Sequence, residues 1–237
     1  MNRVEANTKI ENTATSTYCA IRNDGTLNVS NGSVTADNIA IIASGTVNVS
    51  GGIVESDGSS AIKVISFGSV NVSANAKVVG NGGTAITSES TKANAINITG
   101  GRIEATGKAI NNTANTVITL GTRDGNITKN APVIISENDV AVYSAGGINF
   151  YDGLLLSENS SNVFTGDIID TEAIKYPNLH EYITNFIKND GESEDRKYLP
   201  KLIVWIRQTT DNNPTNFHMD DETYFDFCSW GHNSRWQ

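Results

Sequence analysis

The sequence predicts an all-β parallel β-helix, a solenoid with about three short strands in each coil, followed by a small α+β C-terminal appendage. Three observations support this fold class. A four-residue phrase recurs every 20–26 residues, two shorter apolar units repeat in step with it, and turn-forming residues separate the three units. Repetition with a period of this length is typical of a solenoid, in which each repeat packs against its neighbours.

The recurring phrase alternates apolar and polar residues, which is the two-residue period of a half-buried strand. Its four copies are Leu27-Asn28-Val29-Ser30, Val47-Asn48-Val49-Ser50, Val70-Asn71-Val72-Ser73 and Ile96-Asn97-Ile98-Thr99. In each copy, we expect the first and third residues to face into the solenoid and the second and fourth to face outward.

Equivalent residues of stacked coils lie about 4.8 Å apart, one above the other. The phrase therefore predicts a column of outward asparagines whose side chains hydrogen-bond along the solenoid. The column contains Asn28, Asn48, Asn71 and Asn97, and Asn149 is a candidate to extend it. Several of these asparagines also match the Asn-x-Ser/Thr glycosylation pattern. Because the phrase repeats for packing reasons, the structural role is the preferred interpretation.

Two further units complete each coil. An Ala-Ile pair recurs in step with the phrase, as Ala20-Ile21, Ala40-Ile41, Ala61-Ile62, Ala85-Ile86 and Ala109-Ile110. A second apolar unit follows each copy of the phrase after a turn, at Ser33–Ala36, Ile53–Ser56, Lys77–Gly80 and Arg102–Ala105. Each period therefore contains three short strands, as one coil of a parallel β-helix requires.

The turns and the overall residue usage fit strands better than helices. Glycine pairs such as Gly51-Gly52 and Gly100-Gly101 supply positive φ angles at low energetic cost. The chain has 4 prolines, none of them in the first four coils, where proline would remove ladder hydrogen bonds. An antiparallel sandwich is the main alternative fold, but it does not naturally produce the same three-part phrase in every period.

The repeats suggest three parts along the chain. Residues 1–17 are expected to form an incomplete coil, residues 18–170 the parallel β-helix, and residues 171–237 a helix with strands. The helix is predicted over Leu179–Lys188, after the cap residue Asn178, and a strand over Leu202–Ile206. We expect the helix to cap the solenoid by packing its apolar face against the last coil, with contacts from Leu179, Ile183, Phe186 or Ile187 to Leu154, Leu156, Val163 and Phe164.

The amino-acid composition limits the kinds of binding partner and the cellular location that we expect. The formal net charge of −9 and the pI of about 4.8 argue against nucleic acid and anionic membranes as principal partners. No apolar run is long enough to suggest insertion into a membrane. The 2 cysteines, Cys19 and Cys228, lie near opposite ends and lack metal-binding spacing. No signal peptide is visible at the N-terminus, and we expect the chain to be a piece of a longer protein.

One repeat in particular points to a known family. Gly45–Val54, followed by Ala61-Ile62, resembles the repeats of large secreted or cell-surface parallel β-helix proteins of Gram-positive, especially clostridial, bacteria. Ile118–Gly125 and Gly147–Gly153 resemble segments that follow the repeats in such proteins, so the resemblance covers about residues 18–170. It implies a secreted or cell-surface location. Relatives are regarded as surface, adhesive or carbohydrate-binding modules, and some β-helix proteins of similar shape are polysaccharide lyases.

Candidate functional residues are few. A lyase or hydrolase would need clustered outward carboxylates and a cation, for which Glu55, Glu104, Lys77 and Arg102 are the candidates. Asp37 and Asp57 occupy equivalent turns and are the candidates for a calcium site, with turn formation as the preferred interpretation. Trp230 and Trp236 are the candidates for stacking against a sugar ring, although unassigned tryptophans are more often core residues.

These observations predict a non-enzymatic extracellular module with a structural or adhesive role at a bacterial surface or in a secreted protein. We expect this module to need no cofactor, and we expect a role for calcium only under the second hypothesis, which follows. That hypothesis is a polysaccharide-binding module, calcium-assisted, whose partner is a polysaccharide or a glycan of a host or cell surface. A polysaccharide lyase or hydrolase is the third. Clustered carboxylates would favour the enzyme, a flat aromatic strip the sugar-binding module, and a uniform Ser/Thr/Asn surface the structural role.

Overall fold

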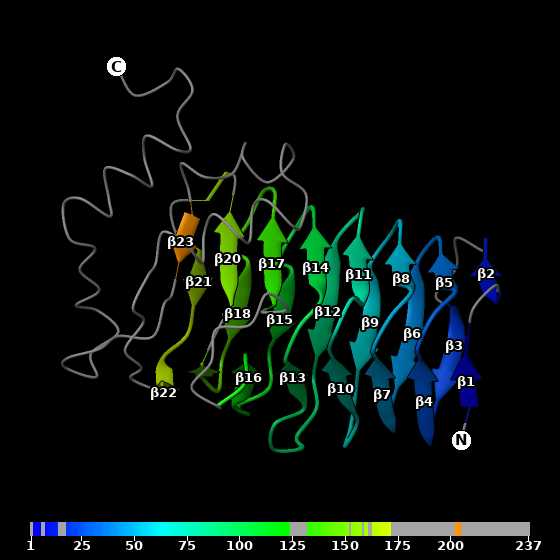
Figure 1. The fold of residues 1–237 in the computed structure, drawn as a ribbon, viewed down its shortest axis with the longest axis horizontal. Helices are drawn as coiled ribbons and strands as arrows, with labels where there is room; N and C mark the ends of the chain where they lie inside the picture. The colour runs from blue at the N-terminus through cyan, green and yellow to red at the C-terminus, as the bar shows by residue number, and fades with distance from the viewer. Residues whose placement is uncertain are drawn as a thin grey trace.

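The computed structural model describes residues 2–5, 8–13, 18–123, 132–151, 153–157, 159–160, 163–171 and 202–204. These residues form a parallel β-helix with three sheets, in which every strand from β1 to β19 pairs with the strand three places later in the chain. Figure 1 shows the coils stacked along the long axis, from the N-terminal strands in blue to the last coil in yellow. The fold class predicted from the repeats is therefore confirmed, with three strands per coil.

The recurring phrase forms the first sheet. Its eight strands are, in spatial order, β1 (Asn2–Val4), β4 (Thr26–Val29), β7 (Thr46–Val49), β10 (Ser69–Val72), β13 (Ile96–Ile98), β16 (Ile118–Leu120), β19 (Ile148–Phe150) and β22 (Ile168–Thr171). Strand β1 lies before the first copy of the phrase, so the sheet begins earlier in the chain than the repeat pattern does.

The two other units form the second and third sheets. The second sheet contains β2 (Lys9–Asn12), β5 (Ser33–Ala36), β8 (Ile53–Ser56), β11 (Lys77–Gly80), β14 (Arg102–Ala105), β17 (Val133–Ser136), β20 (Leu154–Ser157) and β23 (Leu202–Val204). The third sheet contains β3 (Cys19–Asn23), β6 (Ile39–Ala43), β9 (Ser60–Val64), β12 (Thr84–Ser88), β15 (Ile110–Asn112), β18 (Val142–Ser144) and β21 (Phe164–Thr165).

The core is built from columns of the same residue in successive coils. Val49 is 1% exposed and lies in register between Val29 and Val72. In the third sheet, Ile41 and Ile62 are paired in the same way and are fully buried. Because β-branched side chains fit a pleated sheet well, repeating them in every coil builds one contiguous core along the solenoid.

Two glycines in the turn between the first and second sheets are dictated by geometry. Gly32 and Gly52 have φ angles of 76° and 72°, in the region that favours glycine. A Cβ atom at Gly52 would lie 2.5 Å from the carbonyl oxygen of Gly32 in the preceding coil, which is closer than a side chain tolerates. Stacked turns at this corner therefore require glycine for two reasons, conformation and space.

Strand β23 joins the solenoid from the C-terminal part of the chain. It pairs antiparallel with β20, with Leu155 opposite Ile203, in a sheet whose other pairs are parallel. It lies within the predicted strand Leu202–Ile206. The predicted helix over Leu179–Lys188 and its contacts with the last coil fall outside the described residues. The part of the chain that the structure describes holds no helix of the length and apolarity needed to cross a membrane.

Candidate functional site

The outward asparagines of the first sheet contact one another directly. Asn28, Asn48 and Asn71 are in register in β4, β7 and β10. The Nδ2 atom of Asn48 donates to Oδ1 of Asn28 at 2.8 Å, and Nδ2 of Asn71 donates to Oδ1 of Asn48 at 2.8 Å. The side-chain amides thus form a polarised chain in which Asn48 and Asn71 each donate toward the N-terminal end, an arrangement that strengthens each bond. At the start of this chain, Nδ2 of Asn28 is buried without a hydrogen-bond partner.

The register continues this column in both directions. Asn97 of β13 lies beside Asn71, Thr119 of β16 follows it, and Asn149 of β19 comes next. Upstream, Arg3 of β1 lies beside Asn28. Asn149 therefore belongs to the same column, two coils beyond Asn97, with a threonine between them.

The outer face of the second sheet brings one carboxylate and two cations together. Nζ of Lys77 lies 2.9 Å from Oε2 of Glu104, and Nε of Arg102 donates to Oε1 of the same carboxylate. Burial by itself raises the pKa of Glu104, but Arg102 and Lys77 outweigh that effect and hold the pKa below its ordinary value. Glu104 is therefore suited to ion pairing, whereas a general acid needs a raised pKa.

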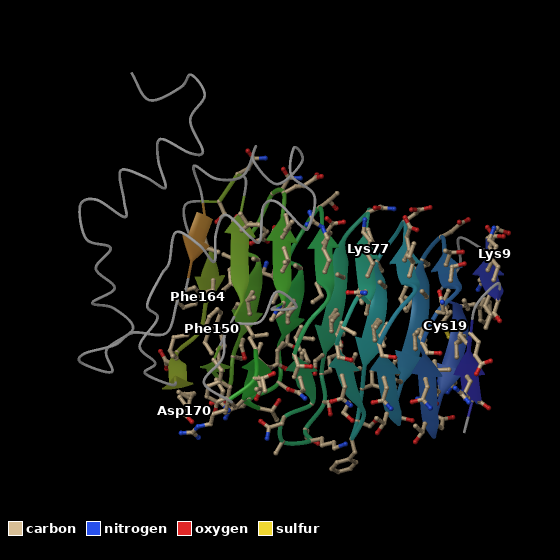
Figure 2. The ribbon with its side chains drawn as sticks, in the orientation of Figure 1. Lys9, Cys19, Lys77, Phe150, Phe164 and Asp170 are labelled. Carbon is tan, nitrogen blue, oxygen red and sulfur yellow. The ribbon has the colours of Figure 1, made fainter. Side chains whose placement is uncertain are left out.

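The second outward glutamate, Glu55, is not adjacent to Glu104. The two occupy the same column, but Val79 of the intervening coil lies between them. At about 4.8 Å per coil, their backbones are about 10 Å apart. Lys77 and Arg102, in the neighbouring column, are in register with each other. Of the four candidates for an enzymatic site, the structure thus brings three together, around one paired carboxylate. Figure 2 shows Lys77 on the solenoid, on the same sheet as Lys9.

Asp37 and Asp57 occupy the same place in successive coils. The N–H group of Asp37 donates to the carbonyl of Asn12, and that of Asp57 to the carbonyl of Ala36, both at 3.0 Å. The side-chain partner of Asp57, however, lies in the next coil. Nδ2 of Asn81 donates to Oδ1 of Asp57 at 2.8 Å and to Oε1 of Glu55 at 2.6 Å. The amide nitrogen of Asn81 therefore lies between the carboxylates of Asp57 and Glu55. A calcium ion at this place would need oxygen atoms as ligands, whereas the structure has a nitrogen donor there.

The remaining candidates are the metal-binding groups, the tryptophans and the cysteines. Among the residues that the structure describes, no three His, Cys, Asp or Glu side chains form a group able to hold a metal ion. Trp230 and Trp236, the candidates for sugar stacking, lie outside the described residues, as does Cys228. Cys19 is a half-buried free thiol in β3.

Two features were not predicted from the sequence. Arg123 donates to Oδ2 of Asp170 at 3.1 Å, Tyr151 donates to the same oxygen at 2.9 Å, and the guanidinium of Arg123 lies 5.5 Å from the Tyr151 ring centroid. No motif or spacing in the sequence predicts this cluster of three side chains.

The other feature is a change in the sequence pattern of β17 and β20, where the alternation of apolar and polar residues gives way to the apolar runs Val133-Ile134-Ile135 and Leu154-Leu155-Leu156. A continuous apolar run is typical of a strand buried on both faces.

In comparisons with known proteins, no family model, no curated protein and no solved structure matches the chain.

Proposed function

We propose that this chain is a non-enzymatic structural module, a rigid rod that spaces or displays other surfaces in a secreted or cell-surface protein of a bacterium. The observation that carries the proposal is the amide ladder of Asn28, Asn48 and Asn71. Its outward side chains donate to and accept from one another along the solenoid. They therefore join three neighbouring coils through two side-chain bonds, so that the amide of Asn48 both donates and accepts within the protein.

The charged groups support the same role. Glu104 is paired with both Lys77 and Arg102, and these three side chains come from two neighbouring coils. An active site of the hydrolase class needs one carboxyl group with a raised pKa, and here the pKa is lowered. The pair of Lys77 with Glu104 ties one coil to the next, as the asparagine ladder does on the first sheet, whereas the pair of Arg102 with Glu104 lies within one strand.

A binding experiment tests the proposal. The full chain is applied to a glycan array with and without millimolar calcium, and the signal is compared with that of the Asn48→Asp variant, whose added carboxylate disturbs the outward face of the first sheet. We expect background signal under every condition. A glycan that binds the parent chain specifically would contradict the structural role and favour the polysaccharide-binding module, and a need for calcium would point to a calcium-assisted site.

A second measurement tests the rod directly. With a compact marker domain fused to each end, small-angle X-ray scattering should give one narrow distribution of distances between the markers. This distribution should be unchanged by calcium, because strand pairing and side-chain bonds within the protein hold the coils together. A broad distribution that calcium narrows would contradict a rigid spacer.

A further inference from the structure

The outer face of the second sheet changes character between β14 and β17. Along one column of paired residues, Lys77 is followed by Arg102 and then by Val133. Along the next column, Glu104 is followed by Ile135 and then by Leu156. The two columns also contain Ile53 and Val79 in earlier coils, but Ile53 is exposed and Val79 is half-buried. After Arg102 and Glu104, the same positions are both apolar and buried. We call Val133, Ile135 and Leu156 the apolar patch.

The apolar patch faces away from the solenoid core and is nevertheless buried. Its members are 5%, 3% and 2% exposed, in the order Val133, Ile135, Leu156. The inward positions beside them belong to Ile134 and Leu155, which are part of the core, whereas the patch residues are not. A single-layered sheet leaves its outer face to solvent, so such low exposure requires atoms packed on the outside.

The C-terminal part of the chain reaches this same region. Strand β23 pairs with β20, the strand that carries Leu156. Figure 1 shows β23, in orange, as the strand beyond β20 in the sheet that also contains β17. Strand β23 is therefore next to a strand of the apolar patch, and all 3 tryptophans of the protein lie in residues 205–237. We propose that residues 172–237 pack across the outer face of β17 and β20 and cover the apolar patch.

This surface differs from the end cap expected from the sequence. A cap would cover the exposed core at the last coil, whereas the apolar patch lies on the side of the solenoid, on strands that already have neighbours on both sides. The change from Arg102 and Glu104 to Val133 and Ile135 marks where the covered area begins, because ion pairs of the earlier coils would be costly to bury under an apolar segment.

Photo-cross-linking of the full chain identifies the occupant. A benzophenone amino acid replaces Ile135 in one sample and Glu55, a half-buried residue of the same column, in the control. Equal amounts of isotopically labelled and unlabelled chains are mixed before irradiation. We expect cross-links from position 135 to residues 172–237 of the same chain, and few or none from position 55. Cross-links to residues 124–131, cross-links between two chains, or no cross-link from position 135 would each overturn the proposal.

Thiol labelling supplies a second measurement with a smaller side chain. In a background of Cys19→Ser and Cys228→Ser, Ile135→Cys is compared with Glu55→Cys. We expect alkylation at position 135 to be at least about 10-fold slower, because the thiol reacts only after local opening of the covering segment. Equal rates, in chains with the same far-ultraviolet circular dichroism, would show that the apolar patch is open to solvent and overturn the proposal.

Discussion

At the scale of single residues, the two faces of one strand have different roles. Val49 of β7 lies in the core between Val29 and Val72, whereas its neighbour Asn48 lies on the outer face and joins Asn28 to Asn71. The inward residue contributes buried apolar surface, and the outward residue contributes two hydrogen bonds. Apolar burial is worth about 1.5–3 kcal/mol for a side chain of this size, and a hydrogen bond about 1 kcal/mol.

Substitutions at these two neighbours should differ sharply in cost. Val49→Asp would place a carboxylate without a partner in the core and should lower the free energy of unfolding by at least about 4 kcal/mol. Asn48→Ser loses the ladder contacts at a half-buried position and should cost about 1–2 kcal/mol. Urea denaturation followed by circular dichroism measures both. Equal midpoints for the two variants would contradict the assignment of inward and outward faces.

At the scale of strands, side chains of neighbouring coils set each other's ionisation. The pKa of Glu104 on β14 is lowered because Arg102 on the same strand and Lys77 on β11 outweigh the effect of burial. A carboxyl group with a lower pKa in the folded state binds fewer protons there than in the unfolded chain. Its stabilising contribution is therefore complete above the ordinary pKa of 4.5 and is lost as the pH falls through the lower folded value.

The variant Glu104→Gln tests this linkage between two strands. At about pH 7 it should be less stable than the parent by about 1 kcal/mol, since a partly exposed ion-pair network is worth little more. The difference should shrink between about pH 5 and pH 3, where the parent loses the contribution. Urea denaturation across this pH range measures it. Arg102→Gln, which keeps the carboxylate, should also weaken the pH dependence, and a difference independent of pH would contradict the argument.

At the scale of the whole molecule, most strands of the solenoid are held by neighbours on both sides. In a parallel sheet, the N–H groups of one strand are shared between its two neighbours. Within the described residues, β20 has neighbours on both sides, β17 and β23, whereas β22 pairs with β19 alone. The pairing of β22 also shifts register beside Ile148. Strands β20 and β22, both in the C-terminal coils, therefore differ in the number of neighbouring strands that pair with them.

Amide hydrogen exchange can compare these two strands within one sample. The amides of β20 should exchange at least about 10-fold more slowly than those of β22, because opening β20 breaks pairing on both sides. The central strand β10, which lies between β7 and β13, provides the fully supported reference. Equal exchange in β20 and β22 would contradict the pairing of β23 with β20.

The sequence by itself determined the repeating part of this protein. Alternation in phrases such as Val47-Asn48-Val49-Ser50 sets which residues face inward, and a fixed order of three units in each period sets the three sheets. These features are local and are repeated in every coil, so a one-residue slip would turn every apolar side chain outward. The asparagine column follows from the same periodicity, because equivalent residues of parallel coils are stacked in register.

Only the tertiary structure decided the contacts between residues that do not occupy equivalent positions in the repeats. Asn81 binds both Asp57 and Glu55, and Arg123 meets Asp170 although 47 positions separate them. The pKa of Glu104 likewise depends on Lys77 from another coil. Such contacts depend on the lengths of turns and on side-chain conformations in three dimensions, which a periodic pattern does not encode. The burial of the apolar patch has the same origin, because it depends on what packs on the outside of the solenoid, where the repeat no longer sets the neighbours.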